Sequence, residues 1–154
     1  MAIIKEEISN SDLEQLLPPI AINANKDDIK AVKTAGFDSL TFLVLVGASS
    51  GQLNNNRYIQ IKLQHSNDKE ANFADCSDKE VVSNEQNHGN IIELKAAPDI
   101  NTRFMVGYIG AKNYVKPVIT TTAEFGNQGV IIGIAALLHA PKYKPVSLEE
   151  LFGI

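Results

Sequence analysis

The sequence predicts an all-β protein, an antiparallel β-sandwich or jelly roll with extended N- and C-terminal arms. Tyr58 to His65 alternates apolar and polar residues with the period of two that a half-buried strand requires. Apolar stretches recur at intervals of roughly ten residues, separated by segments rich in Gly, Asn and Ser, a spacing typical of sandwiches. The chain of 154 residues is sufficient for one domain. We expect an arm at 1–19, a sandwich at 20–140 and a tail at 141–154.

The N-terminal arm is expected to contain a short helix. Small polar residues from Ser9 to Asp12 precede a Leu-containing run, which is the pattern of a helix start. Pro18 and Pro19 would end that helix and leave an extended chain leading into the sandwich.

Two strands are expected early in the sandwich. Leu40 to Val46 is apolar on both alternating faces, which predicts a strand buried on both sides. In the stretch from Tyr58 to His65, the residues expected to face the core are Ile59, Ile61 and Leu63. The polar segment Ala48 to Asn56 between them predicts a turn or loop.

The second half of the sandwich is expected to contain further strands and a hairpin. Arg103 to Ile109 and Tyr114 to Thr122 have the spacing of a hairpin. Pro117 has no backbone N–H, so its strand should be an edge or carry a bulge there. Gly129 to Ala140 is expected to be a strand rather than a short buried helix, because it is rich in β-branched residues and contains two glycines. Short strands are also expected around Phe73, Val81, Val82 and Ile91 to Leu94. In the C-terminal tail, Ser147 and Glu150 have the spacing of a helical capping box.

Composition and charge exclude several functional classes. The net charge of −4 argues against nucleic-acid binding, which normally requires a basic face. The longest apolar run, Val130 to Leu138, is far shorter than the roughly 20 residues of a membrane-spanning helix. The single cysteine, Cys76, excludes an internal disulfide and any multi-cysteine metal site. We therefore expect a soluble protein made in the cytoplasm, with no nucleic-acid or membrane partner.

The sequence predicts no catalytic, cofactor or metal site. The histidines His65, His88 and His139 are widely separated and are interpreted as solvated loop residues. Cys76 has acidic neighbours, which would raise its pKa, so an incidental thiol is expected. The stretch from Asp68 to Asp78 is rich in oxygen ligands, and a weak calcium site there is the alternative to a solvated loop. No nucleophile and base pair is recognisable, which argues against a hydrolase.

Carbohydrate binding is a separate hypothesis, because many β-sandwiches bind sugars on exposed aromatic rings. Tyr108 and Tyr114 flank one predicted turn and are the candidate glycan contacts. Packing in the core or at the rim of the sandwich is the competing interpretation of both side chains.

Three stretches of the sequence carry a resemblance. They are Gly36 to Phe42, Gln64 to Asp68 with Phe73 to Asp75, and Val106 to Lys116. In this order they resemble small structural proteins encoded by tailed bacteriophages, prophages and gene-transfer-agent clusters. The resemblance covers about Ala35 to Pro145, although Asn113 stands where the family usually has an Arg. It implies a virion component without enzymatic activity.

The expected function is therefore that of a capsid decoration protein that binds and stabilises the head. A neck or tail connector, a fibre-anchoring protein and a carbohydrate-binding module are the alternatives. The expected partners are other virion proteins, above all the major capsid protein, and further copies of the chain, for which a trimer is one arrangement. Apolar residues on the arms are the candidate partner contacts, and they are Ile3, Ile4, Ile8, Leu13, Leu16, Leu17, Leu148, Leu151 and Phe152. The alternative is that both arms fold back on their own sandwich.

Overall fold

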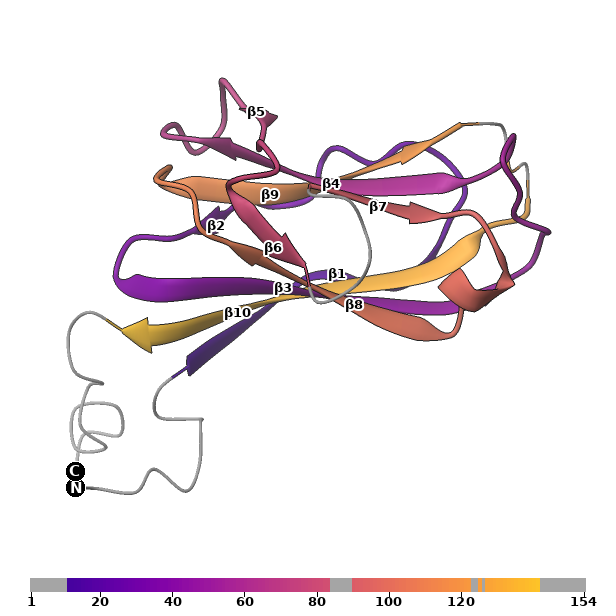
Figure 1. Cartoon of the computed structure of the whole chain (residues 1–154), viewed down its shortest axis with the longest axis horizontal. Coiled ribbons are helices and arrows are strands. Elements are labelled where there is room, and N and C mark those ends of the chain that lie inside the picture. Colours follow the sequence, from indigo (N-terminus) through magenta and orange to yellow (C-terminus); the bar gives the residue numbers. More distant parts are fainter. Residues whose placement is uncertain (1–10, 84–89, 123–124, 126, 142–154) are drawn as a thin grey trace, which may run out of the picture.

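Two antiparallel five-stranded β-sheets pack face to face in the computed structural model, which describes residues 11–83, 90–122, 125 and 127–141 (Figure 1). Sheet A has the strand order β1-β10-β3-β8-β6, and sheet B has the order β2-β9-β4-β5 with β7 also beside β4. The predicted all-β sandwich is confirmed. The described residues contain no α-helix, and they contain one 3-10 turn at Ala97–Asp99. None of the described residues forms a helix long and apolar enough to cross a membrane.

The longest strands belong to sheet A, which is the lower layer in Figure 1. Its strands are β1 (Ser11–Ile22), β3 (Phe37–Ser49), β6 (Val81–Ser83), β8 (Thr102–Tyr108) and β10 (Val130–Pro141). Sheet B consists of β2 (Val32–Lys33), β4 (Ile59–Ser66), β5 (Ala74–Asp75), β7 (Ile91–Leu94) and β9 (Tyr114–Thr121).

The prediction of a helix in the N-terminal arm is wrong, because the residues from Ser11 onward form an edge strand of sheet A. Strand β1 pairs with β10 from Ser11 opposite His139 to Ile22 opposite Val130. The register shifts around Pro18 and Pro19, which an edge strand tolerates because one side of it makes no ladder hydrogen bonds. Residues 11–19 therefore lie in the sandwich, and only 1–10 of the expected arm lie outside the described residues.

The core lies between the two sheets and follows the predicted alternation. Ile59, Ile61 and Leu63 of β4 are buried as expected. They face the inward side chains of β3 and β10, among which Phe42 and Ile132 are fully buried. The prediction that Leu40 to Val46 is buried on both sides is wrong, because alternate residues of β3 point away from sheet B and Leu45 is 54% exposed.

Pro117 occupies an open part of the edge of β9, as its missing N–H predicts. Strand β9 pairs with β4 along one side. On the other side it contacts β2 at Val115 and a single bridge at Ile119, whose N–H and carbonyl both bond to Lys26. Pro117 lies between these two contacts, where no ladder donor is needed.

Candidate functional site

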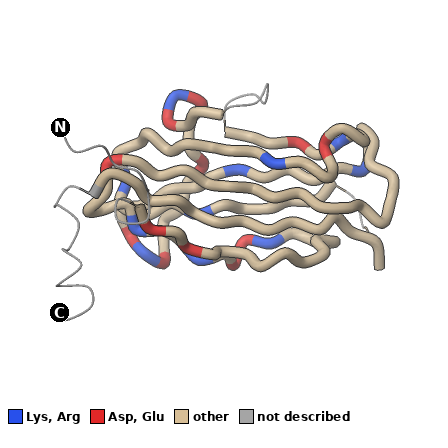
Figure 2. The backbone as a smooth tube through the Cα atoms, turned by 90° about the horizontal axis from the view of Figure 1, so that it is seen from below, with Lys and Arg blue, Asp and Glu red and all other residues tan. Residues whose placement is uncertain are grey.

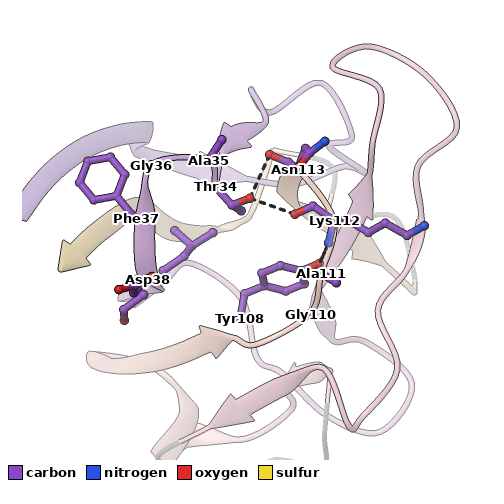
Figure 3. A pocket seen from close by; sticks show the side chains of 12 residues that line it. Thr34, Ala35, Gly36, Phe37, Asp38, Tyr108, Gly110, Ala111, Lys112 and Asn113 are labelled. Carbon is purple, nitrogen blue, oxygen red and sulfur yellow. Dashed lines mark hydrogen bonds between the residues drawn. The ribbon is translucent and has the colours of Figure 1, made fainter. Parts of the chain in front are cut away.

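Three stretches far apart in the sequence meet at the end of the sandwich where β8 ends and β9 begins. The hydroxyl of Thr34 donates to the carbonyl oxygens of Lys112 at 2.9 Å and Asn113 at 3.2 Å (Figure 3). The N–H of Asn113 in turn donates to Oδ1 of Asn67 at 3.3 Å. The segments around Thr34, Asn67 and Asn113 are therefore joined to one another at this end.

Tyr108, the last residue of β8, is central to this end of the molecule. Its ring is buried and meets the ring of His65 edge-on, with centroids 5.8 Å apart. Its hydroxyl lies 2.9 Å from Nδ1 of His65 and accepts a hydrogen bond from the N–H of Lys112 at 3.0 Å. Burial raises the pKa of Tyr108, which keeps the hydroxyl protonated. Gly110 passes so close that a Cβ atom there would lie 2.5 Å from this hydroxyl oxygen.

Two open hollows flank Lys112. The first has a volume of about 510 Å³ and lies between the start of β3 and the loop that follows β8 (Figure 3). Asp38 and Lys112 are the charged residues that line it. The second has a volume of about 520 Å³ and is lined by polar residues after β4, including Asn67 and Asp68. Neither hollow brings together a paired set of carboxylates of the kind that glycoside hydrolysis needs.

Beneath Tyr108, three side chains with metal-binding chemistry converge. One ligand atom from each of His65, Cys76 and Glu80 lies within 4.8 Å of the other two. Nε2 of His65 is 3.8 Å from Oε2 of Glu80. His65 and Cys76 are buried, whereas the Glu80 side chain is 33% exposed. His65 is thus a core residue, and its interpretation as a solvated loop histidine is wrong.

The electrostatic surroundings of Cys76 agree with the sequence-based expectation of an unreactive thiol. Burial raises its pKa to about 12, and the carboxylates of Glu80 and Asp75 add to this effect. A thiol with this pKa is almost fully protonated at neutral pH and is a poor nucleophile.

The acidic stretch from Asp68 to Asp78 does not form a shared calcium cage. The carboxylate of Asp75 accepts hydrogen bonds from Lys62 and Gln64, which lower its pKa. Asp78 instead accepts the N–H of Asn90 at 3.1 Å. Each carboxylate is therefore used locally, and this region holds the His65, Cys76 and Glu80 group instead.

The structure places the predicted partner and glycan contacts in different environments. The prediction that Tyr108 contacts a glycan is wrong, because its ring is buried. Tyr114 is half-buried at the start of β9. Among the β1 candidates, Leu13 is exposed, Leu16 is half-buried and Leu17 is a core residue. The remaining candidates lie outside the described residues, as does His88, and they are Ile3, Ile4, Ile8, Leu148, Leu151 and Phe152.

The outer face of sheet A is a second candidate site, and it is apolar. The strand register places Leu13, Leu137, Thr41, Gly107 and Val82 in one row across all five strands. Leu13 is 62% exposed and Val82 is 56% exposed. Figure 2, which looks toward this sheet from below, shows charged residues mainly in loops and at strand ends, while the strands are largely uncharged. Leu43, Leu45, Met105, Ala135 and Ile131 also point outward.

The apolar residues of this outer face are visible in the sequence of β3, where they predicted a strand buried on both sides. A strand that is apolar on both faces fits either a layer covered on both sides or an exposed binding surface. Because sheet B covers only one side of sheet A, the outward residues of β3 are uncovered in the described structure. The row of outward residues also includes positions on β1 and β6. The sequence does not indicate which strands these two pair with, because that is decided by the topology of the sheet.

The sequence comparisons found no relatives: no protein-family model matches the chain, and no curated protein matches it. A solved structure shares its fold. It is the crystal structure of the SPBc2 prophage-derived protein YomS, which matches 90% of this chain and 98% of its own, with a TM-score of 0.50. Sequence identity to YomS is 10%, so the likeness to YomS concerns the fold alone.

Proposed function

We propose that the chain is a structural component of a phage or prophage particle and acts as a capsid decoration protein. The observation that carries this proposal is the apolar outer face of sheet A, which is suited to association rather than to catalysis. The resemblance of three stretches to phage structural proteins and the fold shared with the prophage-derived YomS support it. The proposed role requires no enzymatic activity.

The proposed occupant of this face is a second copy of the chain. Five strands about 4.8 Å apart and a paired length of about eight residues give a flat footprint of roughly 600 Å². Projecting side chains make the accessible area larger, so the face approaches the roughly 800 Å² that each partner of a standard interface buries. Arg103 is the only charged residue among the described outward positions of the sheet. Pairing of identical faces gives a two-fold dimer rather than a trimer.

A dimer whose two-fold axis runs along the strands would present two copies of the Tyr108 end to a capsid. Ser11 and Pro141, which border the undescribed segments 1–10 and 142–154, belong to this end of sheet A. The apolar residues predicted as partner contacts in those segments would contact the major capsid protein. A molecule that binds only the assembled shell stabilises it by mass action.

The test is the location of the chain on purified particles. A tagged chain is produced in cells that make the particles, and gold-labelled antibody is imaged on them by electron microscopy. We expect label distributed over the head. Label restricted to the neck or tail would replace decoration by a connector role, and a chain absent from particles would overturn the virion proposal. Binding on a glycan array in that last case would favour a carbohydrate-binding module.

A further inference from the structure

We propose that His65, Cys76 and Glu80 form a binding site for a transition-metal ion, with Zn²⁺ as the best fit. Their ligand atoms lie within 4.8 Å of one another. One imidazole nitrogen, one sulfur and one carboxylate oxygen are donors that zinc accepts, and a site with three protein ligands leaves one position for water or a further ligand. Calcium does not fit this set, because it prefers oxygen ligands throughout. This inference is independent of the proposed virion role.

Backbone contacts hold all three ligands in place. The N–H of Cys76 donates to the carbonyl of Leu63 at 3.1 Å, and the carbonyl of Cys76 accepts from Nδ2 of Asn90 at 2.9 Å. The carbonyl of Glu80 accepts the N–H of Ile109 at 2.8 Å. His65 is fixed within β4, which is paired with β5 and β9 at this position. The site is therefore preorganised by three separate strand contacts.

The surroundings of the ligands also fit a metal centre. Nδ1 of His65 contacts the hydroxyl of Tyr108 at 2.9 Å, so Nε2 is the ring nitrogen that faces Glu80. A second hydrogen bond of this kind orients the metal-binding histidine in known sites. Oε2 of Glu80 accepts the N–H of Ser77 at 2.7 Å, which orients the carboxylate in the same way.

Between His65 and Glu80, only a small contraction is needed to close the site, while Cys76, whose sulfur lies within 4.8 Å of the other two ligand atoms, would move toward the ion. Zinc–nitrogen and zinc–oxygen bonds of about 2.0–2.2 Å place two tetrahedral ligand atoms roughly 3.4 Å apart. Nε2 of His65 and Oε2 of Glu80 are 3.8 Å apart. The exposed part of Glu80 provides access from solvent. An ion would also supply the positive charge that a buried thiolate requires.

The test is a metal titration of the full-length chain after treatment with a chelator. We expect one equivalent of Co²⁺ to produce a thiolate-to-metal charge-transfer band, and Zn²⁺ to displace it. Cys76→Ser should abolish the band, and Glu80→Gln should weaken zinc binding by at least the roughly 10- to 100-fold that loss of an outer-shell partner costs. His139→Gln and Glu93→Gln are matched controls on other parts of the sandwich and should leave binding unchanged.

The titration of the unmodified chain tests the proposal even if a variant misfolds. Absence of a thiolate band together with absence of saturable zinc binding near one equivalent would overturn it. Zinc binding that survives Cys76→Ser but is lost in His139→Gln would also overturn it. Zinc should raise the melting temperature of the unmodified chain with increasing concentration, because binding to the folded state alone stabilises that state. Head labelling on particles is measured separately, so either proposal can fail without the other.

Discussion

The hydroxyl of Tyr108 joins two buried or partly buried groups from different segments. It contacts Nδ1 of His65 and accepts the N–H of Lys112. Tyr108→Phe removes both contacts and leaves polar groups without their partner, so the free energy of unfolding should fall by about 1–3 kcal/mol. Urea denaturation measures this loss. Tyr114→Phe is the matched control at a half-buried tyrosine and should change stability by less than about 0.5 kcal/mol. Equal losses in the two variants would contradict a bridging role for Tyr108.

Asn90 replaces a missing strand partner on β4. Strands β7 and β5 pair with the same edge of β4 on either side of Leu63. The Asn90 side chain accepts the N–H of Leu63 and donates to the carbonyls of Leu63 and Cys76, each at 2.9 Å. Asn90→Ala should lower the free energy of unfolding by about 1–3 kcal/mol or more, because buried backbone groups lose their partners.

Asn67→Ala is the control for Asn90→Ala, since within the described part of the chain its side chain accepts one exposed hydrogen bond, from Asn113. Its effect in the same denaturation experiment should be within about 0.5 kcal/mol. If Asn90→Ala were equally mild, water would replace the amide and the gap in β4 would not depend on it.

Single residues also show which features of the site could be predicted from the sequence and which could not. The acidic neighbourhood of Cys76 was readable from the sequence, and it contributes to the raised pKa. The approach of His65 to Cys76 and Glu80 was not, because it requires β4 to pair with β5 in one particular register. A histidine at a strand end carries no local signal of burial, and the contacts that bury His65 with Tyr108, Cys76 and Glu80 come from other segments of the chain.

At the scale of elements, β1 shows most clearly that contacts in the folded chain can outweigh local helical preference. Its Leu-rich start after small polar residues has helical preference, yet pairing with β10 makes it a strand. The stretch from Tyr58 to His65 was predicted correctly because its period of two and its single buried face agree. The hairpin predicted for Arg103 to Thr122 is wrong, because β8 belongs to sheet A and β9 to sheet B, although both strands are present.

The placement of β1 in the sheet can be tested with two leucines on one strand. Leu17 is 3% exposed and faces the core, whereas Leu13 is 62% exposed on the outer face. Leu17→Ala should lower the free energy of unfolding by about 2–5 kcal/mol, as expected for a core leucine. Leu13→Ala should cost less than about 0.5 kcal/mol in the monomer, measured by chemical denaturation at low protein concentration. Similar small effects at both positions would mean that β1 does not pack as a strand.

At the scale of the whole molecule, the outer face of sheet A predicts self-association. Size-exclusion chromatography with light scattering should detect a dimer of the unmodified chain that dissociates on dilution. Leu45→Glu places a carboxylate near the middle of the face, directly opposite Arg103, and a two-fold dimer would bury this charged pair twice. If the desolvation of each pair costs at least about 1.4 kcal/mol, the dissociation constant should rise by at least roughly a hundredfold.

The control for this variant is Ile91→Glu, which adds the same charge at an exposed apolar residue of β7 in sheet B. It should leave the dimer intact. Because Leu45 is 54% exposed in the single chain, Leu45→Glu should retain the circular dichroism spectrum and denaturation midpoint of the monomer. This separates loss of association from loss of folding. A chain that is monomeric at all concentrations, or a dimer that resists Leu45→Glu but not Ile91→Glu, would rule out pairing through sheet A. In that case the proposed occupant of the face would be wrong, and particle labelling would test the virion proposal separately.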